Sequence, residues 1–290
     1  MKGALLAKFK FIESFLVRRG VERLTRKFYL LRRIYRFVIE RLIPKSAINV
    51  LEHKMFLDSV DVLQLFTNGI YENLSTNLLK KEIKKGDIVL DIGAHIGYYT
   101  LIFAKLVGNN GRVYAFEPNP TNFAILKKNI ELNEYKNVVL IQKAVSDKCS
   151  KIKLFLADIN TGDHRIYDSH DGRKFIEVES IKLDDYFKDF RKNINFIKMD
   201  IQGAESCAIY GMQKLLKKNK NLKLTSEFWP IGLKNSGIEP SDYLKMLLNH
   251  GFKLYNIDEI VGKIEQTNPK KLLKIYTPQK ENFTNLLCIR

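Results

Sequence analysis

The sequence predicts a doubly wound α/β fold, in which a mostly parallel sheet carries helices on both faces. From about residue 74 onward, short apolar runs of strand length alternate with helical patterns, as is typical of parallel sheets. The first run, 88–90, leads through Asp91 to Gly93 and Gly97, the pattern of a buried strand that turns tightly into a helix beside a ligand. With 290 residues, 45% of them hydrophobic, the chain can bury a large core.

Hydrophobic periodicity and turn residues place the individual elements. Residues 46–71 carry little pattern, and only 60–66 are expected there as a short strand. A polar segment, 147–185, interrupts the alternation and contains two further β-like runs, 151–156 and 175–183. Strands of the main sheet are expected at 88–90, 112–117, 138–142, 194–199, 222–228, 252–257 and 284–290, and helices near 74–85, from about 97, and near 121–133, 204–217 and 240–250.

The N-terminal segment is strongly basic. Residues 1–45 hold thirteen Lys or Arg against three Glu, so they carry more than half of the formal net charge of +17. Apolar residues recur there every three or four positions and most arginines fall on the other side, which predicts a basic amphipathic helix ending at Pro44. Such a helix can lie on an anionic membrane, or it can pack on the rest of the chain or on a second copy. Nucleic acid is the least favoured partner, because the charge is concentrated in this one helix.

Cysteine usage and hydropathy suggest the compartment. Cys149, Cys207 and Cys288 lie far apart and form no CxxC pair, which argues against a disulfide framework or a zinc site. We therefore expect no bound metal. No apolar run approaches the ~20 residues that a membrane-spanning helix needs. These features predict a cytoplasmic protein, with peripheral membrane contact through residues 1–45 as an open alternative.

Ligands of doubly wound sheets bind at the carboxyl ends of the strands, where this sequence places two acids. Asp91 ends the first strand, and Glu117 follows 26 residues later, near the spacing at which a carboxylate binds both ribose hydroxyls of an adenosine. The loop reads Gly93-x-x-x-Gly97 and lacks the GxGxxG of pyrophosphate sites. Asp91 suits a ligand with an ammonium group. Together these features favour S-adenosylmethionine over NAD.

Three motifs resemble the FkbM family of S-adenosylmethionine-dependent methyltransferases: LDIGAHIGYYT at 90–100, AFEPNP at 115–120 and IKMDIQGAE at 197–205. GDHR at 162–165 and TNLL at 284–287 also match in kind. The resemblance covers roughly residues 65–290 and implies a seven-stranded Rossmann-like methyltransferase fold. We therefore expect a catalytic domain at 51–290 and a helical extension at 1–50. His95 departs from the family, which usually has Asn there, and we expect altered cofactor contacts rather than lost activity.

The resemblance also implies a cofactor site. The loop after the first strand would hold the methionyl end, Glu117 the ribose, and the residues after the third strand would lie along the adenine. Glu72 matches a family acid near the cofactor, although pairing with the dipole of the following helix is an equal alternative. The implied cofactor-binding residues are Glu72, Asp91, Gly93, His95, Gly97, Glu117, Ala144, Val145 and Ser146.

Methyl transfer to a hydroxyl needs close positioning and a base within hydrogen-bond reach. Asp200, at the end of the fourth strand, is the first candidate base. The alternative is that Asp200 only caps the next helix. His164 is the second, because imidazole titrates near neutral pH, and otherwise is only a loop residue. We predict an O-methyltransferase that acts on a hydroxyl of a glycan, a glycolipid or a secondary metabolite. The alternatives are an RNA methyltransferase, which no Asn-Pro-Pro-Tyr or catalytic-cysteine motif supports, and a non-catalytic cofactor-binding protein of the same fold.

Overall fold

The computed structural model describes residues 37, 40–158 and 160–290, so most of the helix expected at 1–45 lies outside the described residues. The described chain forms two compact units. One ends at Tyr71 and includes Asp158–Thr161, and the other comprises Glu72–Ala157 and Gly162–Arg290. The larger unit contains the central sheet and every candidate site residue. None of the helices in the described ranges is long and apolar enough to cross a membrane.

The smaller unit contains an antiparallel pair, β1 (Ile48–Val50) and β2 (His53–Met55), and a short helix, α4 (Leu65–Asn68). The strand expected at 60–66 is wrong. Asp61 has a φ of 47°, in the left-handed region, and its carboxylate accepts hydrogen bonds from the backbone N–H groups of Leu65 (2.8 Å) and Phe66 (3.0 Å). Because the acid satisfies these two donors, the chain turns into a helix instead of extending.

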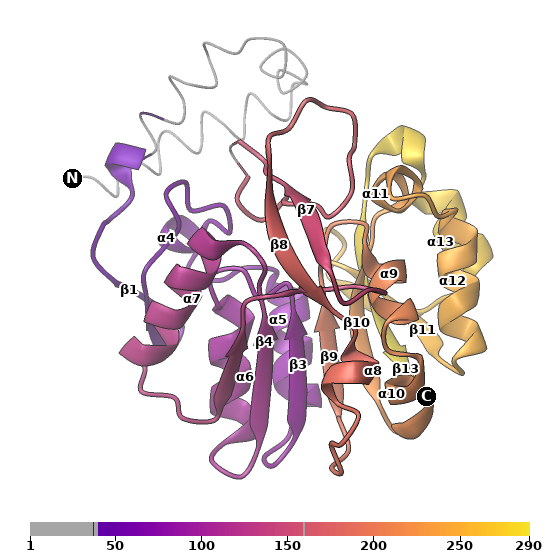
Figure 1. Ribbon diagram of the computed structural model, residues 1–290, viewed down its shortest axis with the longest axis horizontal. Coiled ribbons are helices and arrows are strands. Elements are labelled where there is room, and N and C mark those ends of the chain that lie inside the picture. The colour runs from indigo at the N-terminus through magenta and orange to yellow at the C-terminus, as the bar shows by residue number, and fades with distance from the viewer. Residues whose placement is uncertain (1–36, 38–39, 159) are drawn as a thin grey trace. The chain divides into compact units, whose positions relative to one another are not determined.

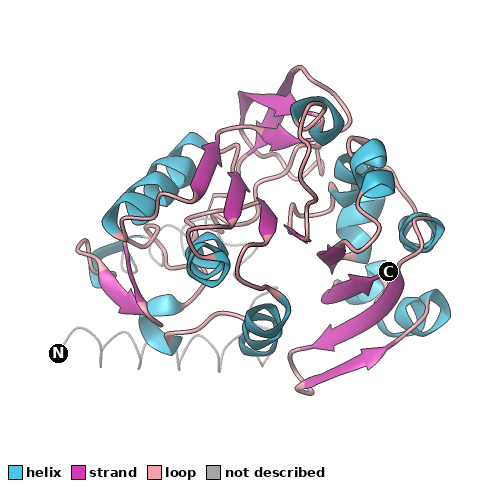
Figure 2. Ribbon diagram, turned by 90° about the horizontal axis from the view of Figure 1, so that it is seen from below, coloured by secondary structure: helices cyan, strands magenta, loops and turns pink. Residues whose placement is uncertain are grey.

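The central sheet of the larger unit has eight strands: β3 (Ile88–Ile92), β4 (Arg112–Phe116), β5 (Val138–Ile141), β9 (Phe196–Met199), β10 (Lys223–Phe228), β11 (Lys253–Asp258), β12 (Lys263–Gln266) and β13 (Thr284–Ile289). Their order is β12-β11-β13-β10-β9-β3-β4-β5. Figure 1 labels β4, β3, β9, β10, β13 and β11 of this sheet. The five strands from β10 to β5 pair in parallel, and β13 is antiparallel to both of its neighbours. Helices lie on both faces (Figure 2), so the predicted doubly wound fold is confirmed.

Seven of these strands were expected, and the eighth, β12, was missed. It pairs antiparallel with β11 at the edge of the sheet, after a turn at Gly262. Three of its four residues are exposed, and its sequence, Lys-Ile-Glu-Gln, is mostly polar. An edge strand of this kind has no buried face, so it leaves no hydrophobic alternation in the sequence.

The five helices expected in the larger unit are present, one of them in two parts, and four further short helices, at 183–186, 230–235, 269–275 and 278–280, were not expected. The helix expected at 204–217 is divided in two at Gly211, where a Cβ atom would lie 2.0 Å from the carbonyl oxygen of Ser146. This close backbone approach explains why glycine stands at 211, and the backbone leaves helical geometry at the next residue, Met212, with a φ of −132°. The helices are α5 (Asn73–Glu82), α6 (Tyr98–Val107), α7 (Pro120–Leu132), α8 (Leu183–Tyr186), α9 (Glu205–Tyr210), α10 (Gln213–Lys218), α11 (Pro230–Asn235), α12 (Pro240–Asn249), α13 (Pro269–Ile275) and the 3₁₀ helix η1 (Pro278–Lys280).

The polar segment 147–185 contributes to a small second sheet, as its two β-like runs predicted. The strands β6 (Ala144–Val145), β8 (Phe175–Ile181) and β7 (Lys151–Phe155) lie side by side in that order. The loop between β7 and β8 carries His164.

The core fixes where the strands of the central sheet end. All five residues of β3 are buried between β4 and β9. Leu90, Phe116 and Ile197 belong to one hydrophobic cluster on these strands, and none of the three is exposed to solvent. Burying such side chains contributes about 1.5–3 kcal/mol each. The rigid strands therefore hold the residues that follow them in fixed positions.

Candidate active site

Carboxyl groups gather at the carboxyl ends of four adjacent parallel strands. Asp91 is the fourth residue of β3, Glu117 follows β4, Asp200 follows β9, and Glu227 is the fifth residue of β10. Because these strands run parallel, their ends lie at one edge of the sheet, where ligands of such folds bind. This edge is the candidate active site.

The loop between β3 and α6 is shaped by its two glycines. Gly93 has a φ of 80°, and a Cβ atom there would lie 2.0 Å from the carbonyl oxygen of Asp200. Gly97 has a φ of 94°, and a Cβ atom there would lie 2.7 Å from Cδ1 of Leu126 on α7. The left-handed backbone and the lack of space both require glycine at these positions. The loop therefore lies directly against the backbone of the segment that carries Asp200.

Asp91, just before this loop, is completely buried. Its Oδ2 atom accepts a hydrogen bond from the Thr100 hydroxyl at 2.5 Å. Its Oδ1 atom has no hydrogen-bond partner within the described part of the chain. Burial raises the pKa of Asp91, against the attraction of the Lys198 ammonium group. Because a buried acceptor without a donor costs free energy, this oxygen fits a donor supplied by a ligand.

Glu117 connects the end of β4 to the glycine loop. Its Oε2 atom accepts the backbone N–H of His95, and its Oε1 atom accepts that of Asn119, both at 2.9 Å. The Asn122 side chain also donates a hydrogen bond to this carboxyl group. A carboxylate has about four acceptor sites, so Glu117 can still accept a hydrogen bond from a ligand hydroxyl. Burial is the main cause that raises the pKa of Glu117 to about 7. Its placement fits the ribose contact that the sequence predicted.

His95 adopts the left-handed conformation, with a φ of 51°. Asparagine, the usual family residue, tolerates the same conformation, which accounts for the exchange at the level of the backbone. Burial, and then repulsion by the Lys198 ammonium group, lowers the pKa of the His95 imidazole to about 4. The ring is therefore neutral near pH 7, and its known contribution to the loop is the N–H group that it donates to Glu117.

The residues predicted along the adenine follow β5 closely. Ala144 and Val145 form β6 and pair with Ser180 and Ile181 of β8. Both are 3% exposed, and Ser146 is 4% exposed. Ala144 and Val145 thus belong to the small sheet, and Ser146 follows them, beyond the carboxyl end of β5.

Glu72 turns its side chain away from the helix that it precedes. It is the N-cap residue of α5, with a φ of 42°, yet it makes no side-chain cap. Its carboxylate accepts hydrogen bonds from the Tyr99 hydroxyl and from Nδ2 of Asn285, each at 2.9 Å. Burial, and then the negative charge of Asp200, raises the pKa of Glu72. These contacts favour a place in the site over the alternative role as a partner of the helix dipole.

Lys198 is a site residue that the sequence did not single out. It lies in β9 and is 8% exposed. Its Nζ atom lies 3.5 Å from Oδ2 of Asp200 and 3.5 Å from the carbonyl oxygen of Gly93. Burial acts to lower the pKa of Lys198, but the carboxylates of Asp200, Asp91 and Glu72 outweigh it and raise the pKa, so the ammonium group stays charged. The sequence does contain a sign of this role, because Lys198 stands between apolar residues in a strand that was expected to be buried.

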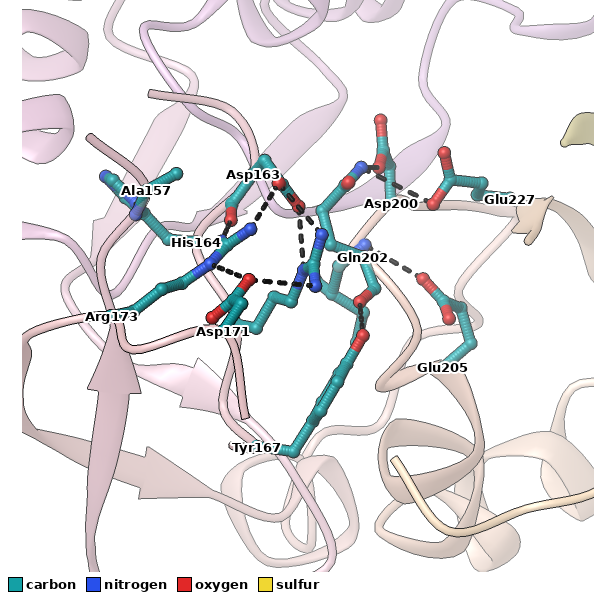
Figure 3. Close-up of polar contacts among 12 residues, drawn as sticks. Ala157, Asp163, His164, Tyr167, Asp171, Arg173, Asp200, Gln202, Glu205 and Glu227 are labelled. Atoms are coloured by element: carbon teal, nitrogen blue, oxygen red, sulfur yellow. Dashed lines mark hydrogen bonds and ion pairs between the residues drawn. The ribbon is translucent and has the colours of Figure 1, made fainter. Parts of the chain in front are cut away.

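Asp200 and Glu227 share the side-chain amide of Gln202 (Figure 3). The Nε2 atom of Gln202 lies 2.9 Å from Oδ1 of Asp200 and 3.4 Å from Oε2 of Glu227. Gln202 has a φ of 57°, and its carbonyl oxygen accepts a hydrogen bond from the Tyr167 hydroxyl at 2.7 Å. The Asp200 side chain is 24% exposed, whereas Glu227 is 6% exposed. The candidate base predicted from the sequence thus has a second carboxyl group beside it.

His164 lies in the loop between β7 and β8. Its Nδ1 atom accepts a hydrogen bond from the backbone N–H of Ala157 at 3.1 Å. Burial, and then repulsion by His95, lowers the pKa of His164 to about 4. The neutral ring therefore carries its proton on Nε2, where it donates rather than accepts. This geometry does not favour His164 as the base.

An ion-pair network holds the same loop. Asp163 accepts hydrogen bonds from Nε and Nη2 of Arg165, at 2.8 and 2.9 Å, and from Nη2 of Arg173 at 2.8 Å (Figure 3). The Arg165 guanidinium also lies 4.7 Å from the ring centre of Trp229, just after β10. The loop is therefore anchored beside the strand end that carries Glu227.

The donors and acceptors at this edge fit S-adenosylmethionine. Asp91 offers an unsatisfied buried oxygen for an ammonium group, Glu117 offers acceptors for ribose hydroxyls, and the glycine loop lets the backbone approach closely. In the described ranges, no group of three or more His, Cys, Asp or Glu side chains is arranged to hold a metal ion.

Residues 91–254 match the family model described as the methyltransferase FkbM domain. The chain belongs to this family. The match covers more than half of the chain and contains the glycine loop, Glu117 and the segment around Asp200. The protein is therefore an S-adenosylmethionine-dependent methyltransferase of the FkbM family.

Related curated proteins differ in what their names say they methylate. A probable cobalt-precorrin-6B C(15)-methyltransferase (decarboxylating) of Saccharolobus solfataricus is 30% identical over 158 residues, 54% of this chain and 73% of the relative. The 2-O-methyltransferase NoeI of Sinorhizobium fredii is 27% identical over 180 residues, 54% of this chain and 72% of the relative. The hexuronic acid methyltransferase AglP of Haloferax volcanii is 26% identical over 172 residues, 59% of this chain and 65% of the relative.

Proposed function

We propose that this FkbM-family methyltransferase transfers the methyl group to a hydroxyl oxygen of a glycan, a glycolipid or a secondary metabolite. The observation that carries the proposal is the pair of carboxyl groups, Asp200 and Glu227, bridged by Gln202 beside the glycine loop. A hydroxyl must lose its proton when it is methylated, and a carboxylate within reach can take it. The names of two relatives, a 2-O-methyltransferase and a hexuronic acid methyltransferase, support an oxygen acceptor on a sugar.

The cofactor would bind across the ends of β3, β4 and β5. In this arrangement the glycine loop and Asp91 hold the methionyl end, Glu117 accepts the ribose hydroxyls, and residues 144–146 lie along the adenine. Glu72 adds negative charge near the sulfonium. The proposed cofactor contacts are Glu72, Asp91, Gly93, His95, Gly97, Glu117, Ala144, Val145 and Ser146.

Asp200 would orient the acceptor. Its side chain is the more exposed of the two bridged carboxyl groups, and Lys198 and Gln202 hold it in place from within the protein. S-adenosylmethionine supplies a methyl group that the sulfonium already activates. The contribution of the chain is then to hold the acceptor oxygen in line with that methyl group, and such positioning supplies much of the rate.

Two measurements test the function. Calorimetry with S-adenosylmethionine should detect binding that Glu117→Ala weakens strongly, and binding that this variant leaves unchanged would refute the proposed ribose contact. Incubation with methyl-labelled cofactor and a panel of glycosides, glycolipids, polyols and RNA should label a hydroxyl-bearing small molecule or glycan. Label found on RNA alone would favour the RNA methyltransferase alternative, and binding without transfer to any cell-extract component would favour a non-catalytic binding protein.

From the sequence alone, we further propose that residues 1–50 form an extension of the catalytic domain, 51–290, and that the basic segment 1–45 contacts anionic membranes. Its charge supports this proposal. Co-sedimentation with vesicles that contain acidic lipids, with and without residues 1–45, tests it. Binding that the deletion does not change would refute it.

A further inference from the structure

Glu227 occupies a protected position beside Asp200. Ser226 pairs with Met199 in the parallel ladder of β10 and β9, so the next residue on each strand, Glu227 and Asp200, lies at the same level of the sheet edge. Glu227 is 6% exposed. Within the described part of the chain, the one hydrogen bond to its carboxyl group is the long 3.4 Å contact from Nε2 of Gln202. Its lone pairs are therefore largely unused.

Most of the charged groups around Glu227 are acids. Asp200 after β9, Glu205 of α9 and Glu72 before α5 all act on it with negative charge, and Lys198 of β9 is the opposing cation. Two neutral phenols, Tyr167 and Tyr243, also interact with it, and Asn285 is its partner across the antiparallel ladder with β13. Burial first, and these carboxylates second, raise the pKa of Glu227 well above its ordinary value. Without a cationic ligand, this carboxyl group therefore holds its proton to a higher pH than an ordinary glutamate does.

The charge of this cluster changes through the reaction. S-adenosylmethionine carries a sulfonium, and the product S-adenosylhomocysteine carries a neutral thioether in its place. A cation placed beside buried carboxyl groups favours their ionised form. The cluster should therefore be most negative while the methyl donor is bound, and its carboxylates should take up a proton readily once the sulfonium charge has gone.

We propose that Glu227 is the proton acceptor of the methyl transfer, becoming ionised when the cationic cofactor binds and taking up the acceptor's hydroxyl proton as the sulfonium charge disappears. The acceptor oxygen forms its bond to the methyl carbon as the carbon–sulfur bond breaks, the electron pair of the broken bond stays on sulfur, and the proton passes to Glu227. Asp200, which already pairs with the Lys198 ammonium group and accepts a hydrogen bond from Gln202, orients the hydroxyl instead. This inference rests on the proposed function and assigns the proton within it.

Proton release on binding tests the assignment without using activity. Calorimetric titrations of the full chain at pH 7.5, in phosphate and in Tris, give the number of protons released from the difference in buffer protonation enthalpy. The wild-type chain should release more protons with S-adenosylmethionine than with S-adenosylhomocysteine. Glu227→Gln should abolish that difference, while Asp200→Asn and the exposed control Glu265→Gln keep it.

Single-turnover kinetics completes the test. Glu227→Gln should lower the methyl-transfer rate by about 10²–10⁴-fold with bound cofactor, and Glu227→Asp should recover part of it and keep the proton release. Circular dichroism checks that each variant is folded. If Glu227→Gln is not folded, a methyl-transfer rate of wild-type size in Glu227→Asp would overturn the assignment. Proton release or a methyl-transfer rate of wild-type size in Glu227→Gln would overturn the assignment of Glu227, but not the proposed function. A wild-type chain that binds neither cofactor nor product would overturn the proposed function, and the assignment with it.

Discussion

The ammonium nitrogen of Lys198 lies 3.5 Å from the Oδ2 atom of Asp200, and the two side chains are 10% and 24% exposed. The same ammonium group interacts with the carboxylates of Asp91 and Glu72. One cation therefore offsets the negative charge that three different segments bring to the site. Asp91 is completely buried, so its ionised form depends strongly on this opposing charge.

Lys198→Met should lower the free energy of unfolding at pH 8 by about 3–5 kcal/mol, since it leaves buried carboxylates without their counter-charge. Urea unfolding measures this. The loss should be smaller at pH 5, because Glu72 and Asp91, whose pKa values are raised, then take up protons more readily. Lys198→Arg keeps the charge and is the matched control. A Met variant as stable as the wild type at pH 8 would contradict this account.

Gly93→Ala should reduce both stability and cofactor affinity. Its Cβ atom would lie 2.0 Å from the carbonyl oxygen of Asp200, so the loop and the neighbouring segment must move apart. Gly86 has a similar φ, 87° against 80°, with nothing within 4 Å of the added atom. Gly86→Ala therefore carries only the strain of the left-handed backbone, about 1–2 kcal/mol. Thermal unfolding measures the stability of both variants and calorimetry their cofactor affinity, and the difference between the variants gives the effect of the clash. Equal losses of stability and affinity in the two variants would rule the clash out.

Glu259 connects the β11–β12 hairpin to the site. Its carboxylate accepts hydrogen bonds from the backbone N–H groups of Leu74 (2.9 Å) and Ser75 (2.6 Å), and so caps the N-terminus of α5. Glu72 is thereby free to point into the site. Glu259→Ala should cost about 1 kcal/mol of stability, typical of a lost cap.

Glu259→Ala should also weaken S-adenosylmethionine binding about fivefold. This is the change in dissociation constant expected when the bound state loses about 1 kcal/mol because Glu72 is no longer held in position. Calorimetry measures the dissociation constant. Glu265→Ala, on the same hairpin, removes only an exposed pair with Lys263 and should leave the constant unchanged. An unchanged constant in Glu259→Ala would mean that Glu72 keeps its place without the cap.

The stability of the cofactor-free chain should fall as pH rises above about 6.5. Burial raises the pKa values of Glu117 and Glu205 to about 7, against ordinary values of 4.5. The folded chain therefore holds protons that the unfolded chain has released, so this contribution is complete below pH 4.5 and is lost as pH rises through 7. His95 and His164, with pKa values lowered to about 4, act in the opposite direction between about pH 4 and 6.5.

Above pH 6.5 the histidines no longer oppose the acids. For each carboxyl group that is protonated in the folded chain and ionised in the unfolded chain, the free energy of unfolding should then fall by about 1.4 kcal/mol per pH unit. Calorimetric melting between pH 6.5 and 8 measures the slope, and Glu117→Gln should make it shallower. A melting temperature that rises over this interval would contradict the assignment of buried, protonated carboxyl groups.

The cofactor side of the site could be predicted because it is encoded locally. Asp91, Gly93 and Gly97 lie in one strand–turn–helix segment, and Glu117 follows at the next strand end, so chain order alone brings them to one edge of a parallel sheet. The structure adds the reason for each glycine, namely the close approach to Asp200 and Leu126. The prediction of a strand at 60–66 was wrong because the Asp61 side chain accepts hydrogen bonds from nearby backbone N–H groups, those of Leu65 and Phe66.

What the sequence by itself determined was the alternation of strands and helices, the glycine loop and the acids at the strand ends, since these follow from periodicity and from short-range geometry. Only the tertiary structure decided that Lys198 neutralises the site, that Glu227 lies beside Asp200, and that Glu259 caps a helix 185 residues earlier in the chain. The interactions of a buried charge depend on distances between segments that are far apart in sequence, and only the packed sheet brings those segments together.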